Sequence, residues 1–548
     1  MQLSGFLGAG SATSMTSFFT LTFFMVFVPL CVISYTLVPN QLKKYHLLLA
    51  SYVFYWLVSG ELIIYLLLST VSICCFGLWL DRVQSKMKSA LSAIPKEEKK
   101  ETKKRYIKKQ RLIILLAVFV HIGVLLFLKY SAFFAFNINK LFAYFNIPVI
   151  LAIPKYLLPI GISFFTLQAL SYILDVYHGV IKADRNIGRL ALFLGFFPQI
   201  VEGPICRYSQ TAEQLWNAGP IKYENLTFGI QRYLFGMLKK LVIADRLSPI
   251  VIEIFDKYNE FSGGIIALGA VFYTIQLYMD FSGSMDAVIG IAQIFGIRMP
   301  ENFERPFFSK SISEFWKRWH ITLGAWMKDY IFYPIVTAGK MKKLTAAARK
   351  KIGNHFGPLL AGSIALFCVW FCNGLWHGSA WSFIFFGMYH FVLILSGNAI
   401  APAVNSINNH LHINADSFWY RLMQMVRTSV LVVIGDLFFR AEGLRNGFLM
   451  FGKMVTGLVP NLFDRQGLIN VLIRTGRNSL DLIIVAVTLV AVFAVSILNE
   501  KGISVRDELA KRKILIRWAV FYLLIVYIVI FGAYGAGYKP IDPLYAQF

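Results

Sequence analysis

The stretch "FFTLTFFMVFVPLCVISYTLV" (18–38) decides the fold class of this chain. It contains no charged side chain, and the first lysine or arginine in the sequence is Lys43. A helix needs about 20 apolar residues to cross the hydrocarbon core of a bilayer, and this stretch is long enough. A secretory signal would have a basic start, a shorter apolar core and a cleavage site, which this stretch lacks. The stretch therefore predicts a membrane helix that is retained in the protein.

Apolar runs of this kind recur along the whole chain. Of the 548 residues, 57% are hydrophobic and 15% are charged, whereas a soluble globular chain is about a quarter charged. The mean hydropathy of +0.60 indicates the same class. We therefore predict an all-α polytopic membrane protein with about eleven spans, forming a single membrane domain over 1–548. Further apolar segments lie at 45–59, 61–80, 112–129, 157–177, 226–243, 263–279, 285–297, 357–375, 380–398, 422–440, 480–498 and 514–534.

Basic residues are concentrated in two loops. The loop at 81–111 has twelve Lys and Arg against four acids, and the loop at 339–353 has six basic residues and no acid. The net charge of +25 would suggest nucleic acid in a soluble chain. In a membrane protein the positive-inside rule explains it, because basic loops stay in the cytoplasm. We therefore expect both loops in the cytoplasm, the N-terminus outside, membrane lipid as a partner and no nucleic acid.

The segment "LFLGFFPQIVEGPICRY" (192–208) is apolar but is broken by Pro198, Gly203 and Pro204. Irregular backbone at membrane depth must be buried in protein or line a water-filled cavity. The sequence therefore predicts a re-entrant segment here instead of a simple crossing.

The segment "EFWKRWHITLGAWMKDY" (314–330) concentrates charge and tryptophan in an otherwise apolar chain. Read as one helix, it places Glu314 and Arg318 four residues apart, where they can pair, and puts Trp316 and His320 on one face. A helix lying in the membrane interface explains most of this composition. It does not explain His320, which is either a structural histidine or a group with a chemical role. Trp316 and Arg318 are candidates for binding or orienting a substrate.

The segment "FCNGLWHGSAWSFIFFGMYH" (371–390) places a histidine after an apolar run. Ionisable groups within membrane spans are costly, so His377 is a candidate functional residue, and histidine suits proton transfer near pH 7. The glycines on either side allow backbone or substrate to approach closely. Asn373, one helical turn earlier, is placed to orient the imidazole, and Trp376 adjoins it. His390 lies in a similar setting but within an otherwise ordinary span.

Carboxylates also occur within "LYMDFSGSMDAVIGIAQIFGIRMPENFERPF" (277–307). Asp286 can bind a cation, carry a proton, or pair with Arg298 or Arg305. Structural pairing is the commonest fate of such a group, and it is our first reading. Ser282 lies close by and is a further candidate for binding or orienting a substrate.

We expect no metal site and no permanently bound cofactor. The six cysteines lack the spacing of zinc ligands. His320, His377 and His390 lack the carboxylate or thiolate neighbours that usually complete a zinc site. The sequence contains no P-loop, no HExxH and no GxSxG nucleophile elbow.

Four stretches resemble, in order and spacing, motifs of the membrane-bound O-acyltransferase (MBOAT) family: "FFPQIVEGPICRY", "MDFSGSMDAVIGIAQIFGIRMPENFERPF", "SISEFWKRWHITLGAWMKDYIFYP" and "GLWHGSAWSFIFFGMYH". The similarity is to the bacterial branch typified by the alginate O-acetyltransferase AlgI. A later stretch, "LFFRAEGLRNGF" (437–448), is also similar to that branch. The resemblance extends over about 155–450.

The resemblance implies a ring of tilted helices, with re-entrant and interfacial helices, around a central funnel. It implies that His320 in "RWH" and His377 in "LWHG" are the catalytic pair, with His377 essential. The implied donor is a cytosolic thioester, acetyl-CoA in this branch. The implied acceptor is an extracytoplasmic polysaccharide, reached through a separate SGNH-like transferase. The implied location is the bacterial cytoplasmic (inner) membrane.

Under this reading, His377 acts as general base towards the attacking hydroxyl. His320, if it donates a hydrogen bond, holds the thioester carbonyl or stabilises the developing oxyanion. Three alternatives remain open: D-alanyl transfer to teichoic acid from a carrier protein, a polysaccharide or lipid transporter without covalent chemistry, and a scaffold for an extracytoplasmic partner. The sequence does not identify the sugar, the acyl group or the partner.

Overall fold

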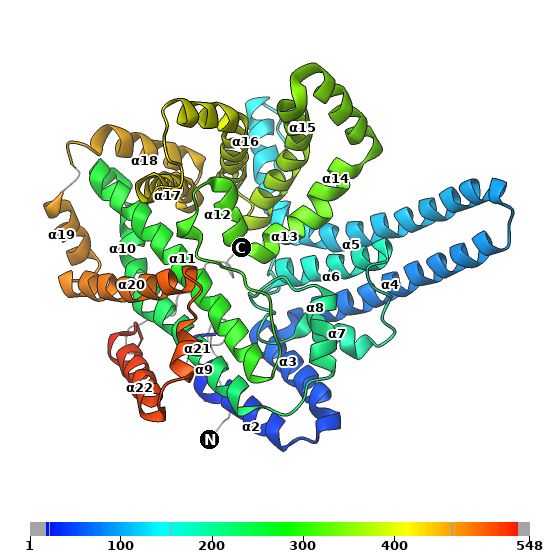
Figure 1. Ribbon diagram of the computed structural model, residues 1–548, viewed down its shortest axis with the longest axis horizontal. Coiled ribbons are helices and arrows are strands. Elements are labelled where there is room, and N and C mark those ends of the chain that lie inside the picture. Colours follow the sequence, from blue (N-terminus) through cyan, green and yellow to red (C-terminus); the bar gives the residue numbers. More distant parts are fainter. Residues whose placement is uncertain (1–17, 21, 155, 462–463, 535–548) are drawn as a thin grey trace. The chain divides into compact units, whose positions relative to one another are not determined.

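The computed structural model describes residues 18–20, 22–154, 156–461 and 464–534. Within these ranges the regular structure is helical, and its one extended pairing is an isolated antiparallel bridge between Phe303 and Trp319. Figure 1 shows the order of the helices along the chain. The prediction of an all-α protein is therefore confirmed for the part of the chain described.

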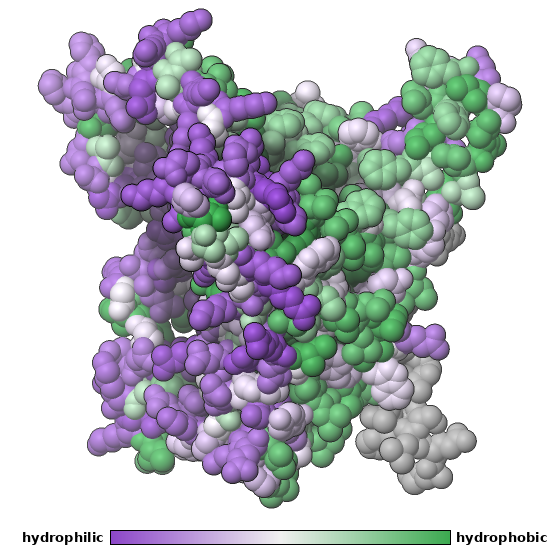
Figure 2. Space-filling model, turned by 90° about the vertical axis from the view of Figure 1, so that its right-hand side faces the viewer, coloured by the Kyte–Doolittle hydropathy of each residue, from purple (hydrophilic) through white to green (hydrophobic). Residues whose placement is uncertain are grey.

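Eight segments in these ranges are long and apolar enough to cross a membrane. They are Asn40–Ser92, which contains α3 (Lys43–Ser59) and α4 (Ile63–Ser92), then α5 (Lys96–Tyr144), α11 (Gly263–Ile294), α15 (Gly339–His377), α16 (Trp381–His410), α17 (Phe418–Arg440), α20 (Ser479–Glu500) and α22 (Ile514–Phe531). Many of their apolar side chains are exposed at the surface of the protein. On α22, for example, Leu515 is 80% exposed and Leu523 is 68% exposed. Such surfaces require lipid as solvent. Figure 2 shows hydrophobic residues gathered on one side of the face viewed, with hydrophilic residues on the other.

The count falls below the predicted eleven because several apolar runs are parts of longer or shorter helices. The runs at 263–279 and 285–297 form one continuous helix, α11. The run at 226–243 is divided between α9 (Tyr223–Met237) and a π-helical turn at Leu238–Ala244. The first run, at 18–38, contains an apolar helical segment of only Thr22–Leu37, and its residue 21 lies outside the described residues.

Shorter helices connect these segments. They are α2 (Val28–Leu37), α6 (Ile162–His178), α7 (Ile187–Gly195), α8 (Tyr208–Trp216), α10 (Asp245–Asp256), α12 (Ile312–Arg318), α13 (Ile321–Met327), α14 (Tyr333–Thr337), α18 (Leu444–Gly457), α19 (Arg465–Arg474) and α21 (Val505–Ala510).

The chain divides by its internal contacts into two compact units. The first comprises residues 1–230 and 288–300, and the second comprises residues 231–287 and 301–548. Both candidate histidines belong to the second unit. The assignment of a single membrane domain stays a prediction.

In the first unit, α4 and α5 form a long antiparallel hairpin (Figure 1). The predicted basic loop at 81–111 is the helical end of this hairpin, interrupted only between Ser92 and Lys96. The second basic loop, 339–353, is likewise helical and is the start of α15, which has a kink at Gly353. Both basic segments therefore continue membrane helices, which does not test the side of the membrane on which they lie.

The segment predicted to be re-entrant is irregular and buried. After α7 ends at Gly195, residues 196–206 form no helix, and all of them are buried. A close contact holds this segment against the start of α6, because a Cβ on Gly161 would lie 1.8 Å from the Ile200 carbonyl oxygen. Gly161 also has a φ of +74°, which glycine adopts without strain. The break in the helix is confirmed, and its depth in the membrane stays a prediction.

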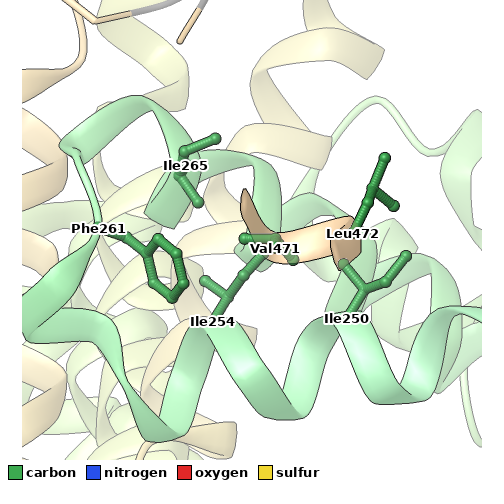
Figure 3. Close-up of a cluster of buried hydrophobic side chains, with 6 residues drawn as sticks. All are labelled: Ile250, Ile254, Phe261, Ile265, Val471 and Leu472. Carbon is green, nitrogen blue, oxygen red and sulfur yellow. The ribbon is translucent and has the colours of Figure 1, made fainter. Parts of the chain in front are cut away.

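The second unit has an apolar contact between α10, α11 and α19. Figure 3 shows Ile250, Ile254, Phe261, Ile265, Val471 and Leu472 packed together. Ile250 and Ile254 are one turn apart on α10, so they present one face to the short helix α19. This contact includes Ile265 and so lies at the N-terminal end of α11, the end that is more distant in sequence from His320 and His377.

Candidate active site

The segment around His320 is not the single helix that the sequence predicted. Helix α12 ends at Arg318, Trp319 is extended, and His320 has φ 48° and ψ 50°, in the left-handed region, before α13 begins at Ile321. A non-glycine residue rarely adopts this conformation. The prediction that Trp316 and His320 share one helix face is therefore wrong, because two short helices meet at an angle at the histidine.

Backbone hydrogen bonds hold this break in place. Phe303 pairs with Trp319 in the antiparallel bridge. The amide of Glu304 donates to the Arg318 carbonyl at 2.9 Å, and the amide of Ile321 donates to the Asn302 carbonyl at 3.0 Å. The segment that follows α11 thus runs alongside the junction between α12 and α13, which satisfies backbone groups that the helix leaves open.

The His320 ring is buried, with 2% of the residue exposed. Its Nδ1 lies 3.2 Å from Oδ1 of Asn302. The edges of two aromatic rings meet it, with centroid distances of 4.9 Å to Phe281 and 5.4 Å to Trp376. Burial lowers the pKa of His320 from 6.5 to about 3. The imidazole is therefore neutral at physiological pH.

His377 is the last residue of α15 and is also 2% exposed. Its ring lies 6.0 Å from Phe386 and 5.2 Å from Phe439, measured between centroids. Close packing of α15 on α16 makes this possible, since a Cβ on Gly374 would lie 2.6 Å from the Phe383 carbonyl oxygen. The expectation that the glycine before His377 permits close backbone approach is confirmed.

The structure brings the two candidate histidines to the same tryptophan. The indole of Trp376 lies 5.4 Å from the His320 ring and 5.1 Å from the His377 ring, measured between centroids. His390 is close to this group as well, because Phe386 lies 4.7 Å from its ring. We call His320, Trp376, His377, Phe386 and His390 the histidine cluster.

The other sequence candidates have varied surroundings. The indole Nε1 of Trp316 donates to Nδ1 of His390 at 3.2 Å. Arg318 pairs with Glu314 at 2.9 Å, as the spacing predicted, and also with Glu500 at 3.1 Å. Asn373 is buried, and its Oδ1 has no hydrogen-bond partner among the described residues; the orienting contact with His377 stays a prediction.

Asp286 is held in ion pairs, with different partners from those expected. It pairs with Arg232 at 3.0 Å and with Lys239 at 2.7 Å, so the predicted partners Arg298 and Arg305 are wrong. The reason is that α9 crosses α11 closely, where a Cβ on Gly236 would lie 2.5 Å from the Gly283 carbonyl oxygen. Sequence spacing did not indicate this crossing.

Lys240 extends this group of charges. It pairs with Asp245 at 3.0 Å and with Asp280 at 2.5 Å. We call Arg232, Lys239, Lys240, Asp245, Asp280 and Asp286 the ion-pair cluster. Ser282 lies between its carboxylates on α11 and is buried, with no hydrogen-bond partner for its Oγ among the described residues.

A cavity of about 450 Å³ lies beside the site, lined mainly by apolar side chains of α11, α17 and α20. Tyr278 lines it and also packs against Trp319 at 5.7 Å, next to His320. Thr274 lines it and donates to Asp436 at 2.9 Å. Neither catalytic candidate lines this cavity, so a passage leading to the histidines stays a prediction.

Asn302 is the residue of the site that the sequence analysis missed. It is fully buried, and its side chain contacts His320, Thr322 and Met285. It lies within the segment 277–307, but nothing in the composition of that segment identifies it as a residue of the site. A buried amide beside a candidate histidine could have been found only by recognising that 302 and 320 lie side by side.

The sequence is similar to those of known proteins. Residues 11–348 match the model of the membrane-bound O-acyltransferase family, MBOAT. The chain is 31% identical over 433 residues to the probable alginate O-acetylase AlgI of Azotobacter vinelandii, covering 79% of this chain and 76% of that protein. It is 29% identical to the peptidoglycan O-acetyltransferase of Helicobacter pylori, over 63% of this chain and 65% of that one.

A third relative is the teichoic acid D-alanyltransferase of Bacillus subtilis, 31% identical over 245 residues, which cover 44% of this chain and 58% of that protein. The relatives are thus acyltransferases that differ in acyl group and acceptor. A buried histidine pair in a multi-pass helical protein and a family match over more than half of the chain lead to one conclusion. The chain belongs to the membrane-bound O-acyltransferase family and is an O-acyltransferase.

Proposed function

We propose that this enzyme takes an acetyl group from cytosolic acetyl-CoA and delivers it across the bacterial cytoplasmic membrane for O-acetylation of an extracytoplasmic polysaccharide, through a separate SGNH-like transferase. The AlgI relative supports the acetyl group, because its similarity extends over 79% of the chain. The D-alanyltransferase relative is similar over 44%. The proposed route across the membrane is a funnel among the tilted helices that leads to the histidine cluster.

The observation that carries this proposal is the contact of Trp376 with both histidine rings. It brings together two imidazoles that are 57 positions apart in the sequence, in surroundings from which aromatic rings exclude water. A thioester held there is protected from hydrolysis, and charges that develop during transfer are poorly screened.

In the proposed reaction, His377 acts as general base. The hydroxyl oxygen of the acceptor attacks the thioester carbonyl carbon while its proton passes to His377. The new C–O bond forms as the C–S bond breaks, and the CoA sulfur leaves with the proton returned by His377. Basic side chains near the cytoplasmic ends of the helices attract the phosphates of CoA. No metal or resident cofactor takes part in this scheme.

D-alanyl transfer to teichoic acid is the second candidate, supported by the Bacillus subtilis relative. It would need an acyl carrier protein as donor in place of acetyl-CoA. The two candidates share the histidine cluster and differ in the donor, so donor competition separates them.

The test uses purified protein in detergent or nanodiscs with radiolabelled acetyl-CoA, and in parallel with a D-alanyl carrier protein. We expect release of CoA from acetyl-CoA, reduced about 10²- to 10⁴-fold by His377→Ala or His320→Ala. His355→Ala, which changes an exposed histidine outside the cluster, is the matched control and should retain wild-type activity. Consumption of the D-alanyl donor alone would refute the acetyl proposal. Full activity of both cluster variants would refute the site.

A further inference from the structure

We infer that Asn302 is a positioning residue that fixes His320 as the Nδ1–H tautomer, so that His320 presents the lone pair of Nε2 to a substrate. This inference rests on the proposed function for the statement that His320 meets substrate. The tautomer itself follows from the hydrogen bonds around Asn302, none of which depends on the reaction.

The orientation of the Asn302 amide is determined by a backbone group. The amide nitrogen of Thr322 lies 3.1 Å from Oδ1 of Asn302, and a backbone N–H can only donate. The atom of the Asn302 amide that faces this N–H must therefore be the oxygen. The oxygen and nitrogen of an amide side chain are usually hard to tell apart, but this contact determines which is which. The Thr322 hydroxyl adds a second donor to the same oxygen at 2.9 Å.

The tautomer of His320 follows from this orientation. Its Nδ1 lies 3.2 Å from the same Oδ1. An oxygen cannot donate from a neutral amide, so Nδ1 must carry the hydrogen. On the other side of the amide, Nδ2 of Asn302 donates to Sδ of Met285 at 3.2 Å, which is consistent with the same orientation. A neutral imidazole has one N–H, so Nε2 carries a lone pair.

The backbone is arranged to keep these two side chains together. The bridge between Phe303 and Trp319 and the hydrogen bond from Ile321 to Asn302 align the two segments on either side of the pair. His320 has a left-handed backbone conformation, with a φ of 48°, and its ring lies with Nδ1 3.2 Å from Oδ1 of Asn302. Two rings that pack on His320, those of Phe281 and Trp376, do not titrate, and the Trp376 ring also contacts the ring of His377.

The chemical consequence concerns the role of His320. An imidazole whose Nε2 has a lone pair accepts a hydrogen bond or a proton at that nitrogen, and it does not donate to an oxyanion there. The sequence-based expectation that His320 holds the thioester carbonyl by donation is therefore replaced. The substrate group that meets His320 is a donor other than the hydroxyl whose proton passes to His377, namely an amide N–H of the pantetheine arm.

The experiment measures the tautomer and the kinetics separately. In protein labelled with ¹³C and ¹⁵N in histidine, ring chemical shifts distinguish the two neutral tautomers, and the signal missing from His320→Asn identifies His320 among the nine histidines. Wild type should show the Nδ1–H form. Asn302→Leu, which is nearly isosteric but has no acceptor, should lose this form. An Nε2–H signal in wild type would overturn the inference, whether or not the protein is an acetyltransferase.

The kinetic measurements use two variants at position 302 and one at Thr322, which contacts Asn302. Asn302→Leu should lower kcat about 10²-fold and raise KM for acetyl-CoA, because the misoriented ring no longer accepts from the pantetheine arm. Asn302→Asp keeps the acceptor and should retain most activity, with the acid limb of the pH profile moved to higher pH. Thr322→Val removes another donor to the same oxygen and should stay within about twofold of wild type.

A purely structural role for Asn302 predicts another result. The loss in Asn302→Leu would then match the loss of folded protein, and the kcat per folded molecule and the pH profile would stay as in wild type. That result would overturn the inference. If instead His320→Asn itself retains full activity while the tautomer is as stated, the proposed function of His320 fails and the positioning by Asn302 stands.

Discussion

The ion-pair cluster and the histidine cluster accommodate buried polar side chains in opposite ways. Both place polar side chains inside an apolar unit. Lys240 is neutralised by Asp245 and Asp280. In the histidine cluster, by contrast, His320 lies against the rings of Phe281 and Trp376 and the side-chain amide of Asn302. One cluster compensates charge with opposite charge, whereas in the other burial keeps the imidazole of His320 neutral.

This difference teaches how function can be separated from stability. Buried ion pairs are costly to break, because removal of one member leaves the other charge desolvated. They therefore suit the fixed crossing of α9 and α11. A neutral imidazole can take up a proton and release it again without disrupting a network of charges, which general base catalysis requires. Four changes test whether the two clusters differ in this manner.

The largest effect is expected for Lys240→Met. Asp245 and Asp280 would lose their shared ammonium group in a buried site, which should lower the free energy of unfolding by about 3–5 kcal/mol. Thermal unfolding in detergent, followed by circular dichroism, measures this. Lys257→Met removes an exposed lysine that pairs with Glu253 and should cost about 0–1 kcal/mol. Equal losses in the two variants would show that the buried cluster is not special.

Gly236→Ala tests the helix crossing that brings these charges together. The added Cβ would lie 2.5 Å from the Gly283 carbonyl oxygen, so α9 and α11 must separate, at a cost of about 1–3 kcal/mol. Gly397→Ala is the matched control, because nothing lies within 4 Å of its added Cβ. The control should be neutral or stabilising by about 0.5–1 kcal/mol. Similar unfolding temperatures for both variants would contradict the close crossing.

The pH dependence of stability tests the neutrality of His320. Burial lowers its pKa to about 3, below the unfolded value of about 6.5. The unfolded chain then binds one more proton, so stability falls as the pH drops from about 6.5 towards 3. Between pH 7 and pH 5 the loss from this group should be about 2 kcal/mol. His320→Asn, whose side chain tolerates the left-handed backbone, should show a shallower slope. An unchanged slope would mean that the pKa of His320 is the same in the folded and the unfolded chain.

The smallest effect is expected for Glu500→Gln. Glu500 pairs with Arg305 at 2.5 Å and with Arg318 at 3.1 Å, but these groups are partly exposed, so the loss of stability should be below about 1 kcal/mol. If Arg318 holds the phosphates of CoA, this change should alter KM for acetyl-CoA and leave kcat unaffected. A stability loss as large as that of Lys240→Met would place this group with the buried ion pairs.

Residue identity and spacing were sufficient for part of the site. The motifs around His320 and His377 selected the two rings that the structure brings to Trp376, and the i, i+4 spacing predicted the Glu314–Arg318 pair. The helix break at His320 was missed, because a helical pattern of aromatic residues cannot reveal a left-handed residue that hydrogen bonds from a distant segment stabilise. Asn302 and the partners of Asp286 were missed for the same reason, since both depend on contacts between segments far apart in the sequence.

The sequence by itself determined that the chain is a helical membrane protein, because the solvation of apolar runs depends only on composition and length. It also determined which residue types were available for proton transfer. Only the tertiary structure decided how many runs form separate helices, which carboxylates meet which cations, and which nitrogen of His320 carries its hydrogen. These outcomes depend on how segments distant in sequence pack against each other, as where Gly236 contacts Gly283 and Asn302 contacts His320. The local sequence around each residue does not determine such contacts.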